Sequence, residues 1–392
     1  MPSFHTISKD KAKRPGQGKE LNARYQYRHW EAMSSSAKNL LILVFILVIF
    51  GLIALSSAGI VESQRKFGSS YYYFSHQVLY GLLPGLLLLF IFAKVKYKFW
   101  KKISLPLLIF SLFALMAVFT SRFGFSAKGA ARWINIGFFS FQPSEILKFS
   151  LIIYFAAWFS GRNEKIQSWS YSVVPFFVVF GFVGLLLAFQ PDVGTLGIVA
   201  LIALAMYFFA GAKLTHFFGL IGFLAVSFFL LVHLAPYRFN RFLAFFNPGS
   251  DPRGISYHIN QALLGIGRGG VWGVGFGQSQ QKINFLPEPV GDSIFAVVAE
   301  ELGLIGAGVL IALLVLLSLQ IVKIAHNTND RFAQLFLLGI TVWIAGQAFI
   351  NISAISGLLP LTGIPLPFVS YGGTSLAMIL ASLGIAINIA NS

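Results

Sequence analysis

The dominant feature of the chain is a series of long apolar runs separated by short polar segments. A helix that crosses a bilayer needs about 20 consecutive, mostly apolar residues. Several runs are short for a full crossing, which tilting or packing beneath neighbouring helices accommodates. The pattern predicts an all-α polytopic membrane protein of about ten transmembrane helices, near residues 39–60, 73–93, 103–120, 146–160, 172–189, 195–211, 214–235, 294–322, 333–350 and 369–390.

Residues 1–38 precede the first run and are polar and basic. They lack the apolar core and small-residue cleavage site of a signal peptide. We expect a disordered cytosolic tail close to anionic membrane lipid, with a docking arm for a partner protein as the alternative. Lys and Arg are more numerous in the segments that then fall inside, so the positive-inside rule predicts cytosolic N- and C-termini. Residues 39–392 are predicted to form one ten-span membrane domain.

Three predicted outer loops are rich in glycine, proline and charge, at residues 121–145, 236–293 and 351–368. The loop 236–293, between spans seven and eight, is too long to be a simple connector. Its glycine-rich run 265–277 lacks the flanking strand and helix of a nucleotide-binding motif. We interpret it as a re-entrant or close-packed segment, which membrane depth tolerates only against protein or water. Function is therefore expected on the outer face.

Composition removes several classes of function. Of 392 residues, 56% are hydrophobic and only 11% charged, against roughly 25% charged in soluble domains. The net charge is +16, but a chain this apolar is not expected to bind nucleic acid. The absence of cysteine excludes disulfides, thiolate metal sites and cysteine nucleophiles. The seven histidines show none of the close pairings typical of metal sites.

Acidic residues at membrane depth are candidates for function, because burying a charge there costs free energy. Glu145 and Lys148 open the fourth run three residues apart, on one helix face. They are either a self-neutralising pair that locks two helices together or the polar wall of a substrate cavity. Asp192 lies in a Pro-Asp-Val-Gly turn between two runs, where it either caps the next helix or has a functional role.

Asp292 follows a proline-rich turn and precedes a long apolar run. One interpretation is a helix N-cap, which Ser293 would provide equally well. The interpretation we favour is a general base near an anionic substrate, because the preceding loop carries Arg241, Arg268 and Lys282. Glu300 shares the helix face of Asp292 and is expected to continue the same cavity. Glu300 and its acidic neighbour cannot both face lipid.

Seven motifs in this order resemble the SEDS family, the polytopic proteins of shape, elongation, division and sporulation. The resemblance extends from about residue 39 to the end of the chain. The motifs lie at residues 128–134, 141–148, 190–195, 241–248, 281–288, 292–303 and 365–373.

The resemblance implies a peptidoglycan glycosyltransferase on the outer face of the bacterial cytoplasmic (inner) membrane. Its substrate would be lipid II, the undecaprenyl-pyrophosphate-linked disaccharide-pentapeptide, and it would release undecaprenyl pyrophosphate. It would act with a class B penicillin-binding protein, which crosslinks the new strand, and with other division proteins. The motif around residues 279–282 and the Phe-Asn-Pro stretch are more similar to the division branch than to the elongation branch, which implies septal wall synthesis. A polymerase of the elongation type is the alternative.

By the same resemblance, Asp292 matches the catalytic acid that deprotonates the acceptor sugar hydroxyl. Val290 and Gly291 depart from the family pattern, which has a polar residue and then Thr or Ser before the aspartate. A divalent cation, Mg²⁺ or Mn²⁺, bridging Asp292 and the pyrophosphate stays open, although the sequence shows no coordination shell. Outer cations would stabilise the leaving pyrophosphate. The candidate substrate-binding residues are Arg132, Trp133, Glu145, Lys148, Asp192, Arg241, Lys282, Glu288, Glu300 and Ser370.

Two other functions compete with polymerisation. A lipid II flippase would suit ten spans with proline-broken outer elements, but it should also carry polar groups in the inner halves of its spans. A non-catalytic scaffold would not require charged residues at costly depths. The concentration of polar residues towards the outer side favours chemistry there.

Overall fold

The computed structural model describes residues 33–120, 124–127, 130–137, 139–161, 168, 173–233, 239, 245–246 and 255–392. Arg241 and most of the predicted basic tail lie outside these residues. Every predicted apolar run contains a described helix. These are α2 (Ser35–Phe67), α3 (Tyr72–Gln77) continuing through η1 (Val78–Leu82) into α4 (Leu83–Lys94), α6 (Ser104–Ala117), α7 (Pro143–Ser160), α8 (Val174–Phe189), α9 (Val193–Phe209), α10 (Leu214–His233), α13 (Ile294–His326), α14 (Arg331–Ile355) and α15 (Gly373–Ala390).

The described helices are those of a multi-pass membrane protein. Six segments are long and apolar enough to cross a bilayer, and three shorter apolar helices lie in α6, α8 and α9. The remaining run is α7, which carries Glu145 and Lys148 in its first turns. The predominantly helical membrane fold is confirmed, while ten as the number of spans stays a prediction.

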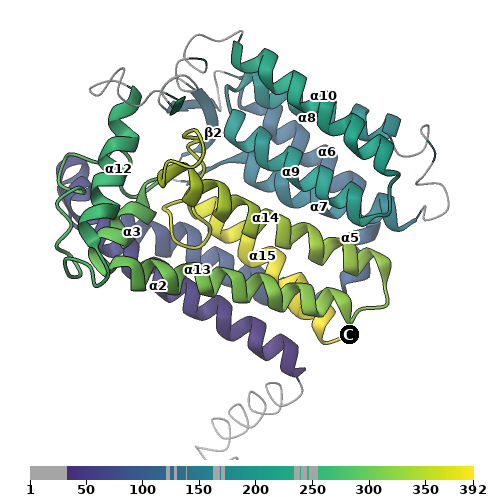
Figure 1. Cartoon of the computed structure of the whole chain (residues 1–392). Coiled ribbons are helices and arrows are strands. Elements are labelled where there is room, and N and C mark those ends of the chain that lie inside the picture. The colour runs from purple at the N-terminus through teal and green to yellow at the C-terminus, as the bar shows by residue number, and fades with distance from the viewer. Residues whose placement is uncertain are drawn as a thin grey trace, which may run out of the picture.

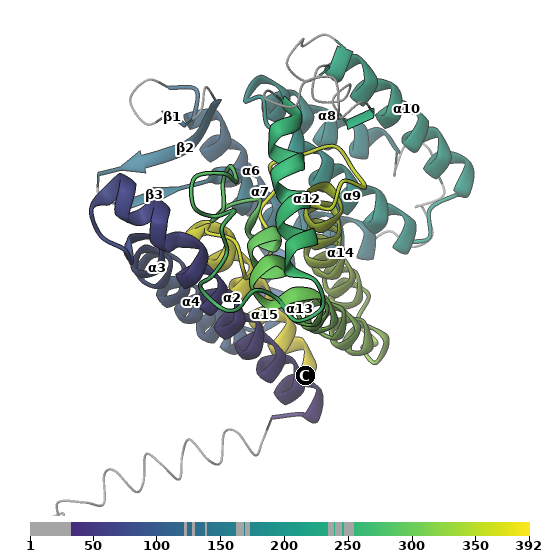
Figure 2. The ribbon, with the colours of Figure 1, turned by 60° about the vertical axis from the view of Figure 1, so that its left-hand side comes forward.

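The helices form a bundle (Figure 1) in which α14 and α15 are the most deeply buried of the six long apolar segments. α15 packs along α4, α13 lies between α2 and α14, and α14 also contacts α7 and α9. The bundle closes at one end through Ser34, whose amide donates to Asn391 Oδ1 at 2.9 Å and whose hydroxyl donates to the Ala390 carbonyl at 2.7 Å. The start of α2 and the end of α15 therefore lie together, at the opposite end from the sheet and α12 (Figures 1 and 2).

The outer loops contain a sheet and a helix that the sequence did not indicate. The first loop holds an antiparallel sheet of β1 (Gly124–Ala127), β2 (Ala130–Ile136) and β3 (Phe139–Phe141), in the order β1-β2-β3. The long loop holds α12 (Ile255–Gly269), which packs against α13. Both escaped a search for long apolar runs because the strands are short and α12 is amphipathic. Among the described residues, this sheet is the only departure from an all-α fold.

The glycine-rich segment after α12 forms backbone hydrogen bonds with α13 where that helix is interrupted. Gly303 has non-helical dihedral angles, φ 67° and ψ −166°, which separate backbone groups on either side from their helical partners. The segment at residues 270–275 supplies replacements, as backbone at membrane depth requires. The four hydrogen bonds run from Val274 N to Glu300 O (3.0 Å), Gly275 N to Glu301 O (3.0 Å), Leu304 N to Gly270 O (2.9 Å) and Ile305 N to Val271 O (3.3 Å).

Gly273 is expected to be essential for these hydrogen bonds between residues 270–275 and α13. A Cβ at this position would lie 2.2 Å from the Glu301 carbonyl oxygen, and its φ of 83° disfavours any side chain. We expect Gly273→Ala to lower the free energy of unfolding by about 2–4 kcal/mol through strain and lost hydrogen bonds. Thermal unfolding in detergent checks this, with Gly267→Ala as the control, because a Cβ there meets nothing within 4 Å. Equal melting temperatures for the two variants would contradict the prediction.

Candidate active site

Asp292 lies in a turn just before α13, and its neighbours are held through their backbone. The Val290 carbonyl accepts a hydrogen bond from the Tyr371 amide at 2.8 Å. The Gly291 carbonyl accepts one from the Ser370 hydroxyl at 2.7 Å. These contacts need no polar side chain at either position, so the departure from the family pattern leaves the turn intact. Ser370, a predicted substrate-binding residue, is thus used to hold the turn.

Two residues that the sequence did not indicate complete the anchoring of this turn. Asn351 of α14 donates from Nδ2 to the Asp292 carbonyl at 2.8 Å. His258 of α12 places Nε2 2.6 Å from the hydroxyl of Ser293, which in turn donates to the Pro287 carbonyl at 2.7 Å. Three separate elements therefore fix residues 290–293.

Glu145 and Lys148 form a buried ion pair, with 2.7 Å between Oε1 and Nζ. The ammonium of Lys148 also donates to Gln347 Oε1 at 2.9 Å and lies 5.1 Å from the centre of the Trp343 ring. Glu145 Oε2 is buried and has no hydrogen-bond partner among the described residues. The pair thus connects α7 to α14, as a helix lock would, and also retains an unsatisfied oxygen, as a cavity wall would.

Asp192 both caps a helix and faces a cation. Its carboxylate accepts hydrogen bonds from the Thr195 amide at 3.3 Å and the Thr195 hydroxyl at 2.8 Å, at the start of α9. Arg132 of β2 places Nη1 3.9 Å from Asp192 Oδ1 and donates from Nη2 to the Pro191 carbonyl at 2.5 Å. Trp133 follows on β2 and is half-buried. The capping interpretation is therefore confirmed, and the ion pair adds a second role.

The loop at residues 356–372 connects these groups. A Cβ on Gly363 would lie 3.8 Å from Asp292 Oδ2, and one on Gly194, at the start of α9, would lie 2.8 Å from the Thr362 carbonyl. The loop also accepts a hydrogen bond at Pro365 O from Gln347 Nε2, at 2.9 Å. Asp292 thus lies beside Gly363, and the Glu145–Lys148 pair is connected to the same loop through Gln347. The Arg132–Asp192 pair lies at the start of α9, where Gly194 packs against the loop.

Glu300 does not join this cluster. Its side chain is fully buried and accepts hydrogen bonds from the Ser279 hydroxyl at 2.5 Å and the Gln280 amide at 3.0 Å. Arg268 of α12 completes its surroundings, with 3.4 Å between Nη1 and Oε1. These contacts hold α12 and residues 279–280 against α13, so Glu300 as a substrate-binding residue stays a prediction that its surroundings do not favour.

Lys282 is likewise engaged inside the protein. Its ammonium lies 2.6 Å from Glu301 Oε1 and donates to Ser57 Oγ of α2 at 2.8 Å. Both acids, Glu300 and Glu301, therefore face protein rather than lipid. Lys282 would have to leave Glu301 before it bound a phosphate.

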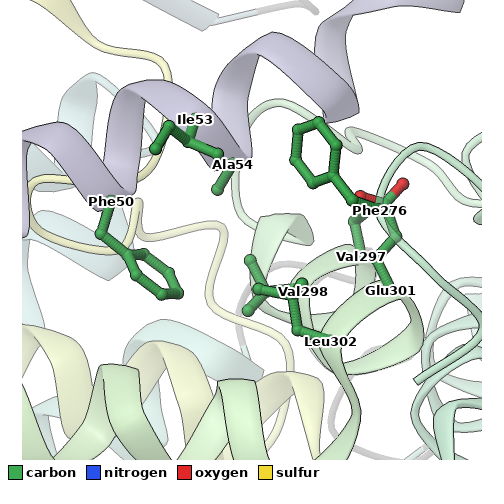
Figure 3. Close-up of a pocket in the computed structure, with 8 residues that line it drawn as sticks. All are labelled: Phe50, Ile53, Ala54, Phe276, Val297, Val298, Glu301 and Leu302. Carbon is green, nitrogen blue, oxygen red and sulfur yellow. The ribbon is translucent and has the colours of Figure 1, made fainter. Parts of the chain in front are cut away.

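An apolar pocket lies beside Glu301, between α2 and α13 (Figure 3). It contains about 330 Å³ of space, part of which is open to the surroundings. Glu301 is its one charged lining residue and is already paired with Lys282, so the pocket offers no group for acid–base chemistry. The other lining residues are Phe50, Ile53, Ala54, Phe276, Val297, Val298 and Leu302.

Glu288 supports the turn before Asp292 through its backbone. It adopts a left-handed conformation, φ 51°, and its carbonyl accepts hydrogen bonds from the amides of Gly291 (3.0 Å) and Ser293 (3.2 Å). Strained backbone of this kind occurs often at functional sites. No cluster of three or more His, Asp or Glu side chains occurs in the described part of the chain. A Mg²⁺ or Mn²⁺ ion at Asp292 would therefore take most of its oxygen ligands from substrate or water.

Comparisons with known proteins show the family of this chain. The family of cell cycle proteins that comprises FtsW, RodA and SpoVE matches residues 37–392. The chain belongs to the SEDS family. Among its SEDS relatives, stage V sporulation protein E of Bacillus subtilis is 37% identical over 352 residues, 89% of this chain and 95% of that protein.

Other SEDS relatives carry an activity in their names. The probable peptidoglycan glycosyltransferase FtsW of Coxiella burnetii is 38% identical over 88% of this chain and 93% of its own. Among solved structures, one of a peptidoglycan synthase complex that coordinates polymerization and crosslinking matches with a TM-score of 0.74 and 27% identity, covering 90% of this chain and 96% of that chain. Thermus thermophilus RodA, the rod shape determining protein, matches with a TM-score of 0.68 and 26% identity, covering 92% and 98%. The SEDS fold is thus shared over nearly the whole chain.

Proposed function

We propose that this SEDS protein is a peptidoglycan glycosyltransferase that polymerises lipid II into glycan strands, with Asp292 as the catalytic base. The observation that carries the proposal is the loop at residues 362–365, which lies beside Asp292 and is connected through Gln347 to the Glu145–Lys148 pair. Relatives that match nearly the full chain are named for this activity.

The reaction needs a proton acceptor beside a cationic surface. Asp292 takes the proton of the acceptor sugar hydroxyl, whose oxygen forms a bond to the anomeric carbon of the donor. The bond between that carbon and the pyrophosphate oxygen breaks, and undecaprenyl pyrophosphate leaves with the bonding electrons. Negative charge develops on the leaving oxygen, where a preorganised cation lowers the barrier.

Two cations are placed for that task in different ways. The Arg132 side chain is 35% exposed, so its guanidinium can donate two hydrogen bonds to a phosphate at the protein surface. Lys148 is fully buried, where low dielectric strengthens the electrostatic attraction of its ammonium for developing negative charge. The other two predicted cations are Arg241, outside the described residues, and Lys282, which is paired with Glu301.

The membrane setting and the partners follow the same proposal. The end of the bundle with the sheet and α12 would face outwards from the cytoplasmic membrane, and both termini would lie in the cytosol. A class B penicillin-binding protein would crosslink the strand, which fits the likeness to a complex that couples polymerization with crosslinking. The FtsW relatives support a role in septal wall synthesis with other division proteins.

The purified protein in complex with its cognate class B transpeptidase is expected to convert lipid II into glycan strands. Gel electrophoresis of labelled lipid II products measures this directly. A complex with a β-lactam-blocked transpeptidase should still polymerise, because crosslinking follows chain growth. Movement of lipid II across vesicles without any glycan product would instead support the flippase. If neither glycan synthesis nor movement of lipid II is observed, the scaffold is supported.

A further inference from the structure

One face of the mainly apolar helix α14 carries an indole and two amide side chains. Trp343, Gln347 and Asn351 are spaced by four residues, so they lie one above another on the helix surface. All three are buried, with exposed fractions of 0%, 0% and 1%. Buried amides are costly unless hydrogen-bonded, which makes their partners informative.

Gln347 connects the Glu145–Lys148 ion pair to the loop at residues 356–372. Its Oε1 accepts hydrogen bonds from Lys148 Nζ at 2.9 Å and from Trp343 Nε1 at 3.0 Å. Its Nε2 donates to the Pro365 carbonyl at 2.9 Å. Two donors face the oxygen and an acceptor faces the nitrogen, so the orientation of the amide is determined.

Asn351 connects the backbone of Asp292 to the same loop. Its Nδ2 donates to the Asp292 carbonyl at 2.8 Å and to the Ile364 carbonyl at 2.7 Å. The two amides therefore contact adjacent loop residues, 364 and 365. Gln347 also contacts the ammonium of Lys148, and Asn351 contacts the backbone carbonyl of Asp292.

We propose that Gln347 and Asn351 are positioning residues that set the separation between Asp292 and Lys148. Four residues of helix fix the two amides about 6 Å apart along a rigid axis. Neither amide would touch the reacting atoms. Each acts through a group that does, Asn351 through the backbone of Asp292 and Gln347 through the ammonium of Lys148. The inference rests on the proposed function for its kinetic consequence, but its geometric consequence is independent of activity.

The kinetic test uses the intact complex with the transpeptidase. Gln347→Ala and Asn351→Ala are each expected to lower kcat for lipid II polymerisation roughly 10- to 100-fold with KM changed less than about twofold, because a displacement of about 1 Å suffices for such losses. Asn351→Asp, which keeps the shape and loses the donor, should be as impaired as Asn351→Ala. Gln334→Ala is the matched control, an amide of the same helix that contacts Arg331 instead, and should retain wild-type kinetics.

The geometric test needs no turnover. The chain has no cysteine, so Ser140→Cys and Phe285→Cys, at two exposed positions, allow spin labels beside the starts of α7 and α13. The distance distribution between the labels should shift or broaden with Gln347→Ala combined with Asn351→Ala, and stay unchanged with Gln334→Ala. An unchanged distribution, or unchanged kcat in both single variants, would overturn the inference. An inactive wild type with a distribution that broadens in the double variant would refute the proposed function and leave the positioning intact.

Discussion

Asp292→Asn is expected to abolish glycan synthesis by the complex of this protein with its transpeptidase. A positioned general base contributes typically 10²- to 10⁴-fold to the rate, and the amide cannot accept the proton. The substitution preserves the shape of the side chain and leaves the backbone contacts of Asp292 with Asn351 in place. The rate of lipid II polymerisation should therefore fall by roughly that factor while the melting temperature stays close to that of the wild type.

Asp330→Asn provides the matched control. Asp330 is the N-cap of α14, and its carboxylate accepts a hydrogen bond from the Ala333 amide at 3.0 Å. Asn caps a helix about as well as Asp, so this variant should keep both stability and activity. Equal product from the Asp292 variant and the wild type would remove Asp292 as the base and direct attention to Glu145 and then Glu300.

Lys148→Met is expected to destabilise the protein strongly. It leaves Glu145 buried without its partner, and breaking a buried ion pair in this way costs about 3–5 kcal/mol. It also removes the ammonium that donates a hydrogen bond to Gln347 Oε1 at 2.9 Å. The additional substitution Glu145→Gln should restore most of the lost free energy of unfolding, because no uncompensated charge then remains.

The double variant separates the two interpretations of this pair. If the pair only locks α7 to α14, the restored protein should polymerise lipid II normally. If it forms the wall of the active site, stability should return without activity, which is the result we expect. Chemical denaturation measures the first quantity and lipid II polymerisation the second. A double variant as unstable as Lys148→Met alone would show that our account of the buried charge is wrong.

The sequence determined the helical membrane fold, because burial in lipid requires apolar runs of a characteristic length. Each of the ten predicted runs contains a described helix. Charged residues were also recognisable one by one, since few acids occur and each is costly at depth. The capping of α9 by Asp192 and the pairing of Glu145 with Lys148 depend on neighbours three residues away, so local spacing revealed them.

The tertiary structure decided which charges act together. The sequence indicated Lys282 and Glu300 as candidate substrate-binding residues, as it did Arg132 and Asp192. In the structure, the contacts of Lys282 and Glu300 instead join residues 279–282 to α13. Such pairings join residues distant along the chain, and no local pattern specifies them.

The same reason explains the residues that sequence reasoning missed. Gln347 and Asn351 are uncharged and sit in an apolar helix, and only the folded contacts with Lys148 and Asp292 show their importance. Their four-residue spacing was the one available signal. The sequence thus determined which elements are apolar enough to enter the membrane and which residues are costly there, while packing between helices distant in sequence decided which partners those residues contact.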